Sequence, residues 1–310
     1  MQAFALRERS QILSNAKRLV FGESDNLPSL IVDQYGDYVV LQTLSTGMEV
    51  FKPLIVELLQ ELLQPKGILE KNDAAVRKQE NLPLEVNVVS GKIPERIIVQ
   101  EAHRQFVVHL MTGQKTGAFL DLRDARFLAG RLSRGKVLDC FSYNGWFACH
   151  MAEQAESVLC VDSSAEACAM VKENAKLNGF EKKIQVVEAN AFDFLREQSD
   201  VNTKFDTVNV DPPAFAKHSK DKVAGQRGYK EINLRALKLL HQEGLLISSS
   251  CSHAMFVGDF EEMLHNAALD TSMQLQILYR LFQTADNPTL SGFPESQYLK
   301  CFFIWASKNT

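Results

Sequence analysis

The stretch VLDCFSYNGWFACHMAEQAESVLCVD, residues 137–162, decides the fold. Its apolar residues indicate a strand over residues 137–141 and a helix over residues 145–154. A second strand follows over residues 157–161 and ends at Asp162. A strand, a helix and a strand in this order predict a right-handed βαβ unit, in which the two strands are parallel.

The same alternation of strands and helices continues to residue 250. Ser164 and Gly179 mark the two ends of the next helix, because serine is a favoured N-cap and glycine commonly follows a helix C-terminus. The further elements that we expect are helices over residues 164–178, 191–197 and 231–242, and strands over residues 184–187, 205–210 and 245–250. Together they predict an α/β fold with a doubly wound parallel sheet.

The end of the chain follows a different pattern. Residues 274–282 and 299–307 are typical of strands, and the segment between them contains Pro288, Gly292 and Pro294. Parallel strands need a crossover, usually a helix, and no helix fits this segment. We therefore expect the C-terminal strand pair to be antiparallel.

The first third of the chain indicates a separate domain. Short strand-like runs alternate there with turn residues, and one amphipathic helix, residues 51–63, stops before Pro65. This mixture is typical of a small α+β domain. We predict an N-terminal helical segment over residues 1–18, the α+β domain over residues 19–112 and the doubly wound domain over residues 113–310.

The composition excludes several classes of protein. The 310 residues are 45% hydrophobic and 23% charged, which is ordinary globular usage and excludes a disordered or collagen-like chain. We find no apolar run of the roughly 20 residues that a membrane helix needs, and no secretory signal. The six cysteines form no C-x-x-C pair, so we expect a reducing cytoplasm and no metal. The net charge is −4, so the protein as a whole does not attract a polyanion, and a polyanion would have to bind at a local basic patch.

The ends of the first two strands predict the cofactor. Ligands of open α/β sheets bind outside the carboxyl ends of the strands. The loop after Asp139 has the single glycine Gly145 and no G-x-G-x-x-G pattern, so it is not built for a pyrophosphate. An acid there suits a cationic ligand such as S-adenosylmethionine, and Asp162 can take both ribose hydroxyls. The alternative for either acid alone is a helix cap or a loop carboxylate.

Further cofactor contacts are expected from the next strand ends and from the entry to this domain. Asn190 can hydrogen-bond the adenine amine while Phe192 packs on the ring. Phe119 and Arg123 could cover the cofactor, the alternative being an interdomain hinge with capping charges. The candidate cofactor-binding residues are Phe119, Arg123, Asp139, Phe141, Ser142, Tyr143, Asn144, Gly145, Asp162, Ser163, Asn190, Ala191, Phe192, Asp211 and Pro212.

The fourth and fifth strands predict the catalytic residues. Asp211-Pro212-Pro213 follows the fourth strand and Ser250-Cys251-Ser252 the fifth, and we expect these strands to be neighbours. A thiolate of Cys251 that adds to C6 of a cytosine makes C5 nucleophilic, and Asp211 near N3 would stabilise the charge on the ring. Five cysteines are expected to be buried, and Cys251 to be the exception.

Basic residues near this site indicate an RNA contact. Residues 215–230 are expected to form a basic loop, which could position phosphates or could be a solvated surface loop. The candidate RNA-binding residues are Arg77, Lys78, Lys115, Lys217, Lys220, Arg227 and Lys230.

The motifs, in this order, resemble the bacterial 23S ribosomal RNA cytosine-5 methyltransferases of the PUA-domain type. The resemblance runs from about residue 21 to the C-terminus, and its motifs are residues 22–28, 32–37, 75–78, 115–117, 141–143, 211–213, 227–230, 250–252 and 298–300. It implies a class I S-adenosylmethionine-dependent fold, an RNA-facing α+β domain and the cysteine of Ser-Cys-Ser as nucleophile. Family members open with a PUA domain, and this chain begins about where that domain would end.

The sequence departs from the family pattern at three positions and leaves other functions open. Asn190 replaces an acid, Asn144 a threonine and Ala118 an aromatic residue. One alternative is methylation of a ring or exocyclic nitrogen, with Asp211 as acceptor and Cys251 in the core. A second is a non-catalytic RNA-binding assembly module. The target nucleotide, the general base and the oligomeric state, a homodimer included, stay open.

Overall fold

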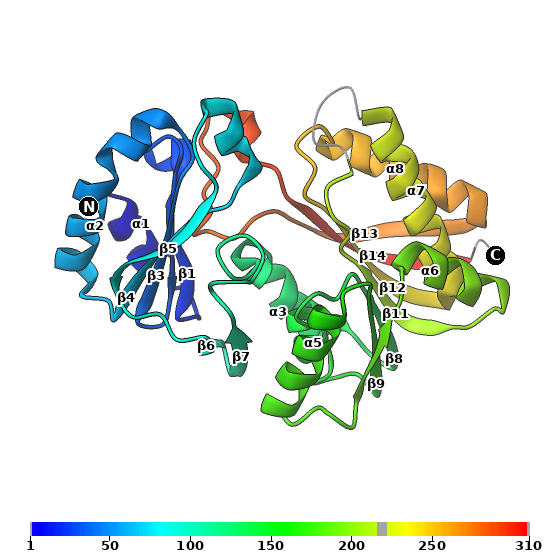
Figure 1. Ribbon diagram of the computed structural model, residues 1–310. Coiled ribbons are helices and arrows are strands. Elements are labelled where there is room, and N and C mark those ends of the chain that lie inside the picture. The colour runs from blue at the N-terminus through cyan, green and yellow to red at the C-terminus, as the bar shows by residue number, and fades with distance from the viewer. Residues whose placement is uncertain (1, 216–221, 309–310) are drawn as a thin grey trace. The chain divides into compact units, whose positions relative to one another are not determined.

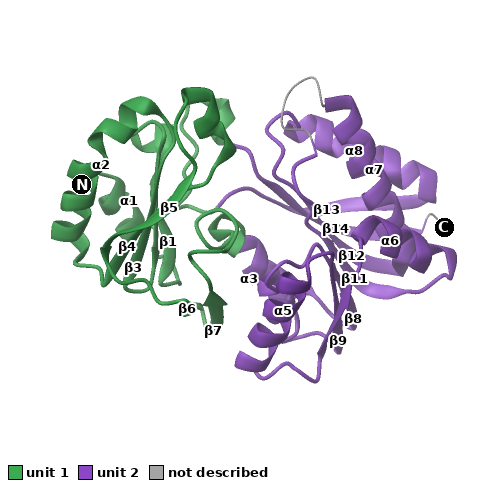
Figure 2. Ribbon diagram, viewed as in Figure 1, with its two compact units in different colours: residues 1–123, 284–296 green, residues 124–283, 297–310 purple. Residues whose placement is uncertain are grey.

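The computed structural model describes residues 2–215 and 222–308, which form two compact units (Figures 1 and 2). Unit 1 comprises Met1–Arg123 and Thr284–Ser296, and unit 2 comprises Asp124–Gln283 and Gln297–Thr310. The boundary therefore lies about ten residues later than residue 112. Residues 284–296 also belong to unit 1, although the residues before and after them belong to unit 2.

A seven-stranded sheet forms the centre of unit 2. Its strands lie in the order β10-β9-β8-β11-β12-β14-β13. The first five are parallel, whereas β14 is antiparallel to both β12 and β13, which confirms the predicted α/β fold and its C-terminal strand pair. The strands are β8 (Lys136–Cys140), β9 (Ser157–Asp162), β10 (Ile184–Glu188), β11 (Phe205–Val210), β12 (Leu240–Ser250), β13 (Met273–Leu281) and β14 (Lys300–Lys308).

Helices cover both faces of this sheet (Figure 1). Leu138, Val208 and Leu246 point to the face where Ile232 and Phe260 of two helices bury them. The helices on that face are α6 (Ala191–Asp200), α7 (Lys222–Leu239) and α8 (Val257–Thr271), and the others are α3 (Arg123–Leu132), α4 (Trp146–Met151) and α5 (Ala165–Leu177).

Two of these helices differ from the prediction. Helix α7 begins at Lys222 rather than at residue 231, so residues 222–230 are helical and not part of a basic loop. Helix α8 was not expected, although Phe260, Met263, Leu264 and Ala267 have helical spacing and are buried. Both helices bury apolar side chains against the same face of the sheet.

Unit 1 contains a five-stranded sheet in the order β1-β2-β3-β4-β5 and a separate β6-β7 hairpin. Helix α1 ends at Arg9 and β1 begins at Ala16, so the predicted helical segment over residues 1–18 is wrong in its second half. The elements are α1 (Gln2–Arg9), β1 (Ala16–Phe21), η1 (Gly22–Asp25), β2 (Leu30–Tyr35), β3 (Tyr38–Thr43), α2 (Thr46–Leu63), β4 (Gly67–Asn72), η2 (Ala75–Glu80), β5 (Glu85–Gly91), β6 (Ile97–Glu101), β7 (Arg104–Val108), η3 (Leu120–Leu122) and η5 (Pro294–Ser296).

A buried ionic network explains why residues 113–123 and 284–296 belong to unit 1. Asp286 is fully buried, and its Oδ2 atom accepts hydrogen bonds from Arg123 at 2.6 Å and from the backbone N–H of Arg18 at 3.0 Å. The Arg18 guanidinium pairs in turn with Asp33 at 2.8 Å. Buried charges require such partners, so the three distant segments are held together.

Candidate active site

Asp139 lies at the end of β8, beneath the loop that leads to α4. Its Oδ1 atom accepts a hydrogen bond from the amide of Asn209 on β11 at 2.7 Å. Asp139 Oδ2 and Asn209 Oδ1 are buried and have no hydrogen-bond partner among the described residues. Burial raises the pKa of Asp139 to about 7, and the charges of Asp211 and Asp162 add to this. Hydrogen bonds from the Asn209 side chain and from the backbone N–H of Ala148 oppose it.

The loop between β8 and α4 is tied to β9 and α5. The backbone N–H groups of Phe141 and Ser142 both donate to the carbonyl of Val161, at 2.9 and 3.2 Å. Asp162 Oδ2 accepts from the N–H of Tyr143 at 2.9 Å, and that residue has a φ of 45°. Asp162, the predicted ribose ligand, therefore also fixes the loop, because one of its carboxylate oxygens accepts the N–H group of Tyr143.

Close packing explains the one glycine of this loop. Gly145 has a φ of 75°, and a Cβ atom there would lie 3.0 Å from a methyl group of Val171 on α5. The side chain of Asn174, also on α5, donates to the carbonyl of Asn144 at 2.8 Å. The glycine therefore allows the helix and the loop to approach. It also adopts the left-handed backbone conformation without strain.

Asn190 and Phe192 lie at the end of β10. The Asn190 side chain caps α6 by accepting from the N–H groups of Phe192, at 2.9 Å, and Asp193, at 3.4 Å. The Phe192 ring is half-buried and lies 6.3 Å from the ring of Phe141 and 5.6 Å from that of Phe215. Neighbouring Ala191 is buried. The cap is a structural role for Asn190, and its adenine contact stays a prediction.

The polar atoms at the ends of β8 and β11 fit S-adenosylmethionine. That cofactor carries an ammonium and a carboxylate group, so its pocket must offer both acceptors and donors. The buried atoms without a hydrogen-bond partner among the described residues include Asp139 Oδ2, Ser142 Oγ, Asn144 Nδ2 and Asn209 Oδ1. Buried polar groups are normally satisfied, so these atoms are available to a ligand with both kinds of group, and their contact with the cofactor stays a prediction.

Three further cofactor candidates have different surroundings. Ser163 is exposed directly after β9. Phe119 and Arg123 belong to unit 1, where the Phe119 ring lies 4.3 Å from Lys115 Nζ and Arg123 is buried against Asp286. These contacts match the hinge interpretation of that segment, and a cofactor contact by either residue stays a prediction.

The two predicted catalytic residues follow neighbouring strands. Strands β11 and β12 are parallel and pair Val210 with Ser248, so Asp211 and Cys251 leave the sheet at the same edge. Asp211 is half-buried, and Pro212 directly after it is buried. Cys251 is partly exposed, whereas the other five cysteines are all buried. The expected exception among the cysteines is therefore confirmed.

Tyr229, Tyr298 and Lys300, which are distant from Cys251 in sequence, contact the segment around it. The hydroxyl of Tyr229, on α7, shares a hydrogen bond of 2.8 Å with Ser252 Oγ. Lys300 Nζ, at the start of β14, donates to the carbonyl of Ser252 at 2.8 Å. The ring of His253 stacks on that of Tyr298 with centroids 5.4 Å apart. Tyr229 and Lys300 were noted only within resemblance motifs, and no local signal in the sequence assigned them a role at this site.

The predicted RNA contacts divide into exposed and buried residues. Lys78 and Arg227 are exposed, Lys115 pairs with Asp121 at 2.8 Å, and Lys230 pairs with Asp270 at 2.8 Å. Lys217 and Lys220 lie outside the described residues.

The expectation for Arg77 is corrected by its burial. Its side chain is fully buried, and its guanidinium donates to Glu49 at 2.9 Å and to the carbonyl of Thr43. An arginine committed in this way cannot reach a phosphate.

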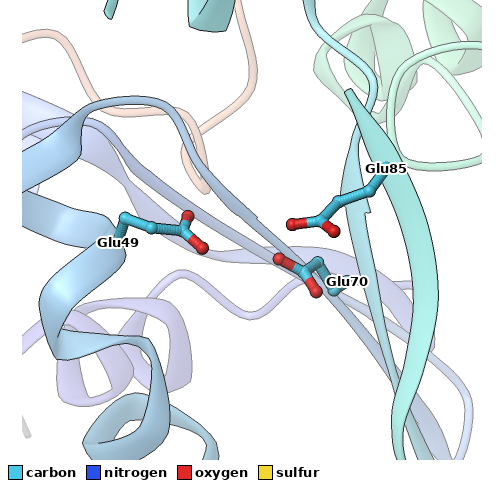
Figure 3. Close-up of side chains that lie close together, drawn as sticks. All are labelled: Glu49, Glu70 and Glu85. Atoms are coloured by element: carbon cyan, nitrogen blue, oxygen red, sulfur yellow. The ribbon is translucent and has the colours of Figure 1, made fainter. Parts of the chain in front are cut away.

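Arg77 belongs to a charge cluster in unit 1. Glu49, Glu70 and Glu85 point toward one another from α2, β4 and β5 (Figure 3). Lys52 Nζ contacts Glu49 and lies 2.5 Å from Glu70. Burial acts to raise the pKa of Glu49, but hydrogen bonds from Lys52, Thr43 and Arg77 outweigh it and lower the pKa to about 2. Each of the three carboxylates pairs with Lys52, with Arg77 or with both, and we assign no metal to them.

The fold is that of the S-adenosylmethionine-dependent methyltransferases. A putative methyltransferase of this class from Streptococcus mutans superimposes with a TM-score of 0.84, at 22% identity, over 98% of this chain and 80% of its own. A family described as Conserved hypothetical protein 95 matches residues 117–261. No helix among the residues described is long and apolar enough to cross a membrane.

Sequence relatives narrow the class to one family. Ribosomal RNA large subunit methyltransferase I of Tolumonas auensis is 39% identical, over 98% of this chain and 79% of its own. The protein of that name from Aliivibrio fischeri (strain ATCC 700601 / ES114) is 40% identical, over 92% of this chain and 73% of its own. The chain belongs to the family of ribosomal RNA large subunit methyltransferase I. The expectation of a methyltransferase is confirmed, and the non-catalytic alternative is not retained.

Proposed function

We propose that the protein transfers the methyl group of S-adenosylmethionine to C5 of a cytosine in RNA, with 23S ribosomal RNA as substrate, in the cytoplasm. The observation that carries this proposal is the placement of Cys251. It is the partly exposed cysteine of the six, and it follows β12, whose neighbour β11 is followed by Asp211. Membership of a ribosomal RNA methyltransferase family supports the RNA substrate.

The chemistry needs a nucleophile, because C5 of cytosine does not attack a methyl group unaided. The thiolate of Cys251 forms a bond to C6, and the C5=C6 electron pair becomes available at C5. A protonated Asp211, placed near N3, would donate a hydrogen bond there and so stabilise the negative charge that this addition puts on the ring. S-adenosylmethionine, when bound, supplies an electrophilic methyl group on a sulfonium. Loss of the C5 proton to a base then restores the double bond and expels the thiolate.

The cofactor and the RNA would be held by residues of different regions. Asp139, Ser142 and Asn144 supply buried acceptors and donors for the amino-acid end of the cofactor, and Asp162 the acceptor for its ribose. Lys78, Lys115, Arg227 and Lys230 are the described residues that we propose as phosphate contacts, because each carries its charge at or near the surface.

The covalent step is tested with RNA that contains 5-fluorocytosine. Fluorine replaces the C5 proton, so the thiolate cannot be expelled and the protein stays attached to the RNA. We expect a stable adduct with the native protein and with Cys160→Ala, a buried control, and none with Cys251→Ala. An adduct on Cys251→Ala, or none on the native protein while it still methylates RNA, contradicts the proposal.

A second candidate is methylation of a ring or exocyclic nitrogen of an rRNA base. It is favoured by the half-buried Asp211 directly before two prolines, where its carboxylate could accept a hydrogen bond from an amino group. Mass spectrometry of the digested product separates the two, because 5-methylcytidine and N-methylated nucleosides fragment differently. In this second case Cys251→Ala would still transfer the methyl group.

A further inference from the structure

Lys300 is a buried cation beside the segment that bears Cys251. It is 2% exposed, and the antiparallel pairing of β12 with β14 sets it opposite Ser250. Its ammonium group donates to two carbonyl oxygens, those of Ser252 and Tyr298, each at 2.8 Å. None of the ion pairs found among the described residues includes Lys300. Its hydrogen-bond acceptors are therefore neutral, which is unusual for a buried ammonium.

The charge of Cys251 acts on this lysine. Burial lowers the pKa of Lys300 to about 8, and negative charge on Cys251 opposes that lowering more than the charge of Asp259 does. Attraction between two groups is reciprocal, so the ammonium of Lys300 also favours the thiolate of Cys251 over the thiol. A cation near a cysteine is a common way to make a thiol nucleophilic.

We propose that Lys300 is the positioning residue of the active site, which keeps Cys251 as a thiolate and fixes the backbone that carries it. The catalytic purpose of this thiolate rests on the proposed function, whereas the test of the thiolate does not. The ammonium orients Ser252 through one hydrogen bond and Tyr298 through another. It balances the negative charge on sulfur before the bond to C6 forms and after that bond breaks, and Lys300 itself exchanges no atom with the substrate.

Four other titratable groups of the described residues come from the elements around this segment. Tyr229, from α7, has its pKa raised by burial and is engaged with Ser252. Asp259, from α8, is paired with Lys222 at 2.8 Å. Asp211, after β11, leaves the sheet at the same edge as Cys251 and is assigned to the substrate ring in the proposed function. His253 stacks on Tyr298 within the same segment. The ammonium of Lys300 is a cationic group that donates a hydrogen bond to this backbone.

The test measures the alkylation of Cys251 by iodoacetamide as a function of pH, followed by mass spectrometry of its peptide. Only the thiolate reacts, so the midpoint of the pH profile reports the thiol pKa. The variants are Lys300→Met, which removes the charge at similar length, Lys300→Arg, which keeps it, and Lys176→Met, an exposed lysine of α5. No RNA or cofactor is needed.

We expect the native midpoint below the ordinary cysteine value of about 8.5. Lys300→Met should raise it by about one pH unit, Lys300→Arg should restore it in large part, and Lys176→Met should leave it unchanged. A purely structural lysine would change the rate at every pH and leave the midpoint where it is. An unchanged midpoint in a folded Lys300→Met variant overturns the proposal.

Two further outcomes keep the inference separate from the proposed function. If Lys300→Met does not fold, the alkylation profile of the native protein still tests the proposal. A native midpoint at or above about 8.5 contradicts a thiolate held by Lys300. If the midpoint shifts as expected but 5-fluorocytosine RNA forms no adduct, the ammonium–thiolate pair stands and the covalent mechanism fails. An adduct with an unshifted midpoint supports the mechanism and removes Lys300 from it.

Discussion

The amide of Asn209 donates to Asp139 Oδ1 at 2.7 Å and so joins the ends of β11 and β8 directly beneath the loop of residues 141–145. The remaining oxygen of each side chain is buried with no hydrogen-bond partner among the described residues. This pair therefore presents two acceptors at the predicted cofactor site. Its carboxylate, with a pKa of about 7, changes charge near neutral pH.

The first prediction concerns the pH dependence of cofactor binding. Ionised Asp139 attracts the cationic groups of S-adenosylmethionine, so the affinity should increase as the pH rises through about 7. Asp139→Asn should bind more weakly and lose this part of the pH dependence. Isothermal titration calorimetry at several pH values measures both effects. The control is Asp193→Asn, an exposed acid on α6, which should titrate like the native protein.

The same carboxylate predicts an opposite trend in stability without the cofactor. Its pKa is raised from 3.8 to about 7, so the native state binds this proton more tightly than the unfolded state. Its contribution to stability is full below the unfolded pKa and is lost as the pH rises through about 7. Asp139→Asn should therefore gain in thermal midpoint relative to the native protein at higher pH. Equal differences at pH 5 and pH 8 would contradict this assignment.

The second prediction concerns Tyr229→Phe, which removes the hydrogen bond to Ser252 Oγ. We expect a loss of about 1 kcal/mol in the free energy of unfolding, and up to about 3 kcal/mol if the buried Ser252 hydroxyl finds no other partner. Urea unfolding measures this loss. Tyr279→Phe, at a tyrosine that is 46% exposed, is the matched control and should be neutral. A neutral result at both positions would show that the hydrogen bond does not stabilise the segment around Cys251.

The third prediction concerns the ionic network of unit 1. Asp286→Asn leaves Arg123 buried without its countercharge, and breaking such a pair costs about 3–5 kcal/mol. Thermal unfolding should show a large decrease in the midpoint. Lys66→Met, which breaks the exposed pair with Asp37, should change it little. Similar effects of the two substitutions would mean that burial does not decide the strength of these pairs.

The fourth prediction concerns RNA affinity. Arg227 is exposed on α7, and we propose that it contacts a phosphate. Arg227→Gln should weaken binding to ribosomal RNA fragments and reduce the slope of log K against log salt by about 0.7–0.9. Fluorescence anisotropy at several salt concentrations gives that slope. Lys176→Gln should leave it unchanged, and an unaltered slope in Arg227→Gln would exclude the contact.

The strands and their order of appearance could be predicted because each is a short apolar run bounded by turn residues. The predicted strand over residues 205–210 matches β11, and the antiparallel ending followed from a linker that could hold no helix. Helix boundaries were less accurate. Helix α7 starts nine residues earlier than predicted, since the burial of Tyr229 in the core over the sheet favours helix where the local sequence resembles a basic loop.

The sequence alone determined the fold class, the placement of Asp139, Asp162 and Asp211 within one residue of a strand end, and the exposure of Cys251 among the cysteines. These follow from local periodicity and from the residue types at each strand end. Only the tertiary structure decided that Arg77 is buried, that residues 284–296 belong to unit 1, and that Lys300 lies beside Ser252. Those facts depend on pairs tens to hundreds of residues apart. Such pairs form because buried charges must find partners, and a sequence read locally does not say which partners they find.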